Sequence, residues 1–131
     1  MAKQSHSRLR APGKRGTTAL EYGLVAPVLF LFLIGIMDMG RLMWMYAGLY
    51  RGVEAAARCG AVDTATCGTT AEIQSVAAAA VWGATVSSPV FTVSTAASCG
   101  VQVTASYSFQ FYTPGFSTIT LAPSACFPSL H

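Results

Sequence analysis

The hydrophobic pattern divides the chain into a long apolar run, an amphipathic continuation and a segment of alternating residues. Residues 22–37 contain no charged side chain, and with residues 17–21 they reach about the 20 residues that a helix needs to cross a bilayer. Charges at helical spacing continue the pattern to about Arg58. We therefore predict one helix over residues 17–58, bent at Pro27 because proline removes a backbone hydrogen bond.

The second half of this helix is more than a membrane anchor requires, so it must pack against another part of the protein. Its charged side chains can pair on one face, as Asp38 with Arg41, Arg51 with Glu54, and Glu54 with Arg58. Aromatic side chains lie where the helix would leave the bilayer, at Trp44, Tyr46 and Tyr50. The apolar run continues directly into this half with no small-x-small site, so a cleaved secretory signal peptide is not indicated.

The residues after this helix predict a small second unit. Thr69 is followed three residues later by Glu72, the spacing of a capping box, and a short amphipathic helix then runs to about Gly83. Three strands follow, over residues 89–95, 101–111 and 117–122. The second strand alternates apolar and polar side chains, and a turn over residues 113–116 leads to the third. The predicted fold class is α+β, with a long helix, a short helix and a three-stranded antiparallel sheet.

Composition and charge support a membrane-attached protein. Of 131 residues, 53% are hydrophobic and only 10% are charged, which is too apolar for an ordinary soluble domain. The net charge of +3 comes from an N-terminal tail: five of the eight Lys and Arg precede Gly16, whereas the chain from Thr17 onward has three basic and five acidic residues. Basic residues beside a span stay in the cytoplasm. Because these cations are not gathered on a folded face, no nucleic acid is expected as a partner.

The four cysteines, Cys59, Cys67, Cys99 and Cys126, all follow the apolar run and indicate disulfides in an oxidising compartment. Four cysteines allow three pairings. Proximity favours Cys59 with Cys67, which leaves Cys99 with Cys126. The second pair is not a direct cross-strand match, because a turn centred on Pro114 and Gly115 would place Cys126 opposite Val103. A diversion of the chain at Pro123 is one way to close that gap.

Catalytic and metal sites are not predicted. Residues 73–130 contain no charged side chain and no histidine, so neither a Ser-His-acid nor a Cys-His arrangement can form there. There is no C-x-x-C motif, and the two histidines, His6 and His131, lie at opposite ends of the chain. We therefore expect no enzyme activity, no metal, no cofactor and no small-molecule substrate.

One stretch resembles a known family. The segment "RGTTALEYGLVAPVLFLFLIGIMDMGRLMW" has the end of a basic leader at Gly16, then four residues, then Glu21-Tyr22, then an apolar helix containing proline and followed by Asp38. It resembles the N-terminus of the TadE-like minor pilins, or pseudopilins, of the tight-adherence (Flp) pilus, a branch of the type IV pilus systems. The later "RGVEAAARCGAV" and "ASCGVQVTASYSF" are also similar to this family.

The resemblance implies a pilin-like fold and a defined processing site. In such families a prepilin peptidase in the inner membrane cuts after the leader glycine, which corresponds here to the bond between Gly16 and Thr17. Glu21 then becomes the fifth residue of the mature chain, beside Tyr22, and its carboxylate can pair with the terminal ammonium of a neighbouring subunit. The implied partners are the inner membrane, the prepilin peptidase, the major pilin, other minor pilins and the pilus assembly platform.

The expected organisation has four parts: a cytoplasmic basic leader over residues 1–16, a transmembrane helix over 17–40, its extension outside the membrane over 41–62, and an exported α+β domain over 63–131. The expected location is the bacterial inner membrane, with the domain outside the cytoplasm. The alternative function is an unprocessed single-pass envelope protein, whose exported domain binds a partner or acts as an assembly factor. In that case Glu21 only marks the interfacial end of an anchor.

Overall fold

The computed structural model describes residues 15–83, 85–86 and 90–129. Helix α1, Arg15–Val62, is one α-helix of 48 residues with Pro27 inside it, about 70 Å long at 1.5 Å per residue. The predicted long helix is therefore confirmed, and it runs four residues beyond Arg58. The bend at Pro27 stays a prediction. Most of the predicted basic leader, residues 1–14, and both histidines lie outside the described residues.

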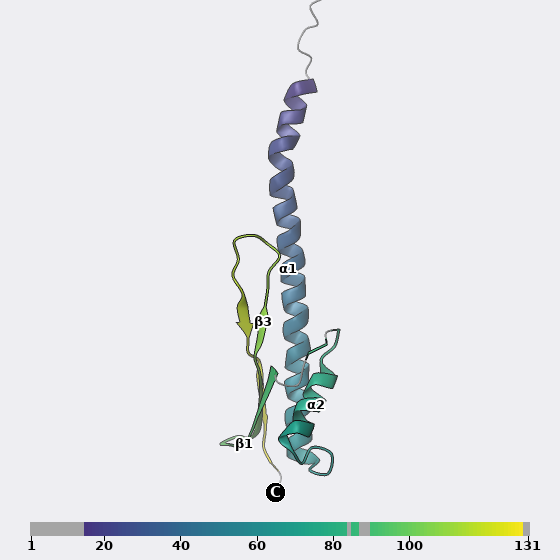
Figure 1. The fold of residues 1–131 in the computed structure, drawn as a ribbon, viewed down its shortest axis with the longest axis vertical. Helices are drawn as coiled ribbons and strands as arrows, with labels where there is room; N and C mark the ends of the chain where they lie inside the picture. Colours follow the sequence, from purple (N-terminus) through teal and green to yellow (C-terminus); the bar gives the residue numbers. More distant parts are fainter. Residues whose placement is uncertain (1–14, 84, 87–89, 130–131) are drawn as a thin grey trace, which may run out of the picture.

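The two halves of α1 have different surroundings. The N-terminal half projects beyond the rest of the protein, whereas the C-terminal half is covered by helix α2 on one side and by strands on another (Figure 1). Five side chains of the covered half are completely buried: Leu49, Val53, Ala56, Ala57 and Ala61. Their spacing places them on one face of the helix. The expectation that the second half packs against another part of the chain is confirmed.

Helix α2, Thr70–Ala80, begins as its sequence predicts. The Thr69 hydroxyl accepts a hydrogen bond from the Glu72 N–H, and the Glu72 carboxylate accepts one from the Thr69 N–H. This reciprocal capping box satisfies two N–H groups that a helix start leaves unpaired. Ile73 and Ala77 are buried against α1, so the short helix covers the apolar face of the long one.

The strands form two small sheets. Strands β1 (Phe91–Ala97), β2 (Gly100–Ala105) and β5 (Ser124–Phe127) make an antiparallel sheet in the order β1-β2-β5. Strands β3 (Tyr107–Phe109) and β4 (Ile119–Leu121) make an antiparallel pair of their own. The three-stranded antiparallel sheet is thus present, but its third strand is β5 and not the predicted segment 117–122.

The long strand predicted from alternation is interrupted, and so is the segment that pairs with it. The segment 101–111 divides at Ser106 into β2 and β3, and the Ser106 N–H donates to the Val90 carbonyl at 2.9 Å in the register of the β1–β2 pairing. On the opposite strand Pro123 has no N–H to donate, which separates β4 from β5. The Pro123 carbonyl still accepts from the Ala105 N–H at 2.9 Å, so the two short strands continue one after the other.

Two disulfides close the domain, with the pairing that proximity favoured. Cys59 joins Cys67 across a Cα–Cα distance of 5.8 Å, and Cys99 joins Cys126 across 6.2 Å. Cys126 lies opposite Gln102 and not opposite Val103, so the predicted register was wrong by one residue.

Pro123 does not cause this difference in register. The two segments pair in the same register on both sides of the proline, with Tyr107 opposite Leu121 and Gln102 opposite Cys126. Cys99 reaches its partner because it lies in the tight turn between β1 and β2, where Ala97 pairs with Gly100.

Candidate functional site

The N-terminal half of α1 is the first candidate site. The described helix is long and apolar enough to cross a membrane, and the apolar window that meets this criterion is not buried by the rest of the structure. Large apolar side chains are exposed all along it, including Leu24, Leu29, Phe30, Phe32 and Ile36. Such a surface is unfavourable in water and fits lipid or a packed bundle of helices.

The residues of the predicted processing motif lie at the start of this helix. Gly16 and Thr17 belong to its first turn, and the side chains of Glu21 and Tyr22 are exposed one turn further along. Among the side chains that the structure describes, none forms a hydrogen bond or ion pair with the Glu21 carboxylate. Glu21 is therefore positioned where a group from another molecule can approach it.

Asp38 forms a contact that the sequence did not reveal. Its side chain is only 2% exposed, because the loop between β3 and β4 folds against α1 at this point. The Asp38 carboxylate accepts hydrogen bonds from the Tyr112 N–H at 2.9 Å, the Thr113 N–H at 2.7 Å and the Thr113 hydroxyl at 2.6 Å. The Arg41 guanidinium donates a fourth at 3.1 Å and forms the predicted ion pair.

Arg41 strengthens the same contact from the other side. Its guanidinium carbon lies 4.2 Å from the centre of the Tyr112 ring and 5.2 Å from that of Phe109, both within range of a cation–π attraction. We call Asp38, Arg41, Phe109, Tyr112 and Thr113 the hairpin clamp. It ties the loop between β3 and β4 to α1, and no buried side-chain nitrogen or oxygen of the described residues lacks a hydrogen-bond partner.

The other predicted ion pairs are not formed. Among the described residues, the pair Asp38–Arg41 is the one that comes within 4.0 Å, so the pairs of Glu54 with Arg51 and with Arg58 were wrong. These three side chains are exposed, and in water such pairs contribute little free energy.

The loop closed by Cys59 and Cys67 is held by a carboxylate. Asp63 accepts from the Thr66 hydroxyl at 2.8 Å and from the N–H groups of Ala65 and Thr66 at 3.1 Å. These bonds, that of the Thr66 hydroxyl above all, hold the pKa of Asp63 below its ordinary value. Within the described ranges, no three His, Cys, Asp or Glu side chains are grouped so that they could hold a metal ion.

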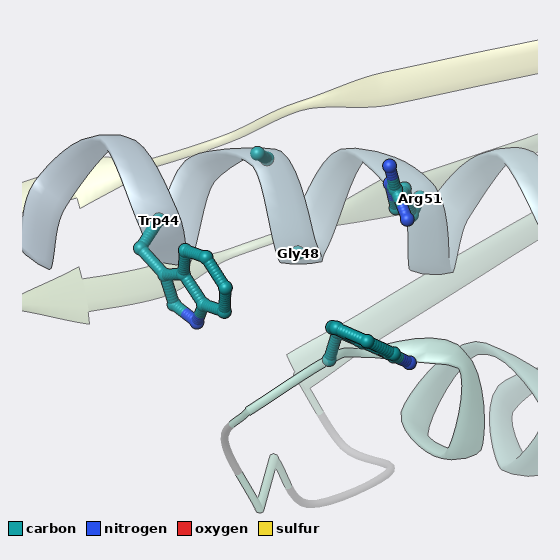
Figure 2. Close-up of a pocket in the computed structure, with 5 residues that line it drawn as sticks. Trp44, Gly48 and Arg51 are labelled. Atoms are coloured by element: carbon teal, nitrogen blue, oxygen red, sulfur yellow. The ribbon is translucent and has the colours of Figure 1, made fainter.

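A pocket of about 190 Å³ lies between α1 and the segment that follows α2, lined by Trp44, Ala47, Gly48, Arg51 and Trp82. Figure 2 shows the Trp44 indole projecting from α1 toward that segment, with Arg51 further along the same helix. Both indoles are largely exposed. The pocket has no carboxylate, histidine or thiol in its lining, so it offers surface contact and no general acid or base.

Comparison with known proteins identifies the N-terminal part. Residues 16–58 match the family model of TadE-like proteins. The chain carries a TadE-like segment. This segment includes Gly16, Glu21 and nearly all of α1, and it ends just before the first cysteine. Neither the curated proteins nor the solved structures contain a match to the chain.

The match covers about a third of the chain and shows that its N-terminal segment is similar to TadE-like proteins. Within the described residues one helix, α1, is long and apolar enough to cross a membrane, and its uncovered N-terminal half fits a membrane protein. The match to TadE-like proteins agrees with the resemblance found in the sequence.

Proposed function

We propose that this protein is a structural minor pilin, or pseudopilin, of a tight-adherence pilus, made as a precursor that a prepilin peptidase cuts between Gly16 and Thr17. The observation that carries this proposal is the start of the TadE-like match at Gly16, the residue at which the basic leader is predicted to end. Cleavage there removes 16 of the 131 residues and leaves a mature chain of 115.

In this proposal the leader is cytoplasmic and the disulfide-bonded domain lies outside the cytoplasm. Five basic residues precede the apolar helix, and Lys and Arg beside a span are retained on the cytoplasmic side. Two disulfides in so small a domain also support an oxidising compartment. The protein is then a single-pass protein of the inner membrane before assembly.

The proposed role of Glu21 begins after cleavage. The new ammonium at Thr17 and the Glu21 carboxylate are one helical turn apart, and in a bundle of such helices the carboxylate can pair with the ammonium of a neighbouring subunit. The exposed position of Glu21 and the uncovered apolar helix around it support this role. The neighbours are the major pilin and other minor pilins, brought together on the assembly platform.

The test is the intact mass of the protein extracted from membranes of cells with and without the prepilin peptidase. We expect the mass of residues 17–131 when the peptidase is present and that of the full chain when it is absent. G16L should stay full-length in both strains, because a bulky side chain at the scissile position obstructs the extended backbone that a protease binds. A full-length parent in both strains would favour the unprocessed single-pass envelope protein.

A further inference from the structure

The loop that connects β3 and β4 carries an apolar tip. We define the hairpin tip as residues 110–118, which contain no charged side chain. Two aromatic side chains are strongly exposed on it, Tyr112 at 75% and Phe116 at 67%. Phe111 connects them to the domain, because its ring lies 5.2 Å from that of Phe109 and 5.7 Å from that of Phe116. Exposed aromatic rings on an uncharged loop require an explanation other than packing within the domain.

The hairpin tip lies beside the apolar half of α1. Figure 1 shows the loop between β3 and β4 extending along the helix, past the rest of the domain and toward the N-terminal end of the helix. A shallow pocket at the contact is lined by residues of α1 and of the tip: Gly35, Asp38, Met39, Phe111, Thr113 and Phe116. The hairpin clamp at Asp38 fixes the tip at this level.

The same level is where the helix should leave the hydrocarbon. A span of about 20 residues that begins at Thr17 ends at Ile36, and one that begins at Tyr22, after the charge of Glu21, ends at Arg41. The hairpin tip lies beside α1 at Gly35 to Met39, from one residue before the first limit to two residues before the second. Whichever start applies, Phe116 lies within about two helical turns of the outer boundary of the bilayer core.

We propose that the hairpin tip is a membrane-docking element, which inserts Tyr112 and Phe116 into the headgroup and acyl-chain boundary of the outer leaflet. This inference rests on the membrane span of the proposed function. Aromatic side chains are favoured at this depth, and apolar ones gain free energy there by leaving water. Lipid is the fitting occupant because the tip is continuous with the lipid-facing surface of α1 and has no charge to desolvate.

The hairpin clamp explains how an aspartate can lie so close to the hydrocarbon. A bare carboxylate at this level would be costly, but Asp38 is covered by the hairpin and receives four hydrogen bonds and the charge of Arg41. The exported domain is thereby held at a fixed height on the bilayer, with Trp44 about 9 Å further out along the helix, at the level of the headgroups.

Depth-dependent fluorescence quenching tests the proposal on the full chain in lipid bilayers. In a W44F/W82F background, single tryptophans are introduced at three positions of similar exposure: F116W at the tip, F30W in the span and V62W at the far end of α1, where the parent side chains are 67%, 63% and 61% exposed. The lipids are phosphatidylcholines brominated near either end of the acyl chain. Y112W tests the tip at a second position, should F116W disturb its own packing.

We expect F116W and Y112W to emit at shorter wavelength than V62W and to be quenched mainly by bromine near the glycerol end. F30W should be quenched more by bromine near the methyl end. V62W lies roughly 36 Å from Asp38 along the helix, so neither brominated lipid should quench it. If F30W is quenched and both tip variants behave like V62W, the docking proposal is wrong while the span holds. Tip emission that is shifted but not quenched would mean that a second protein surface covers the tip, which also overturns the proposal. If F30W is not quenched either, the span of the proposed function fails as well.

Discussion

Gly52 lies at the closest approach between the two helices, and replacing it with alanine tests the packing directly. A Cβ atom at this position would lie 2.8 Å from the Ala77 carbonyl oxygen and 3.0 Å from Cγ2 of Val81. Ala77 is completely buried in the last turn of α2. Its carbonyl is part of the helix backbone, so this end of α2 would have to shift away from α1.

Two opposing effects set the size of the change. Alanine is favoured over glycine in a helix interior by about 1 kcal/mol. Overpacking a filled core costs typically about 1–3 kcal/mol, and a clash with the backbone belongs in the upper part of that range because no rotamer change relieves it. We therefore expect G52A to lower the free energy of unfolding of the exported domain by about 1–2 kcal/mol.

Two glycines of the same helix provide matched controls. At Gly48 the added Cβ would lie 3.4 Å from its nearest neighbours, Cγ1 of Val81 and the Trp82 carbonyl oxygen, which is ordinary contact. G48A should therefore be neutral or should raise stability by up to about 1 kcal/mol. At Gly60 the nearest atom, at 2.8 Å, is Cδ1 of Ile73, the end of a flexible side chain that can turn away, so G60A should fall between the other two.

The assay is urea unfolding of the full chain in detergent with both disulfides intact, followed by the tryptophan fluorescence that Trp82 contributes beside α2. The urea concentration at the transition midpoint should be highest for G48A, lower for G60A and lowest for G52A, and the slopes of the three transitions should be similar. Should G52A unfold at the same urea concentration as G48A, the helices do not approach as closely as the structure shows and the argument from the Ala77 carbonyl fails.

Three further predictions concern the two disulfides, the hairpin clamp and the processing motif. Removing the Cys99–Cys126 bridge, whose cysteines are 27 residues apart, should lower the free energy of unfolding by about 3.5 kcal/mol. Removing the Cys59–Cys67 bridge, whose cysteines are 8 residues apart, should lower it by about 2.5 kcal/mol, because a shorter loop restricts the unfolded chain less. Equal shifts in the unfolding midpoint would refute this dependence on loop length. T113V removes the hydroxyl donor to Asp38, so the hairpin tip should be cut faster by protease, whereas T120V on the exposed face of β4 should not change the rate. E21A should insert and be processed yet fail to support pili, and normal pilus counts would contradict the proposed charge pairing.

The sequence by itself determined the elements that depend on local spacing. A helix of this length follows from the uncharged run and from charges at helical intervals. The start of α2 follows from Thr69 and Glu72, because a capping box is a contact between residues three apart. The Cys59–Cys67 bridge is likewise close in the chain. The resemblance of the start of α1 to TadE-like proteins was also visible in the sequence alone.

The tertiary structure alone decided where strands end and what the hairpin touches. Alternation across Ser106 is unbroken in the sequence, yet the chain pairs with β1 and β5 before this residue and with β4 after it. Asp38 looked like one half of an i,i+3 pair, yet three of its four donors come from residues 74 and 75 positions away. Contacts across such separations leave no periodic signal in the chain, since they depend on how the packed elements meet and not on the spacing within any one of them.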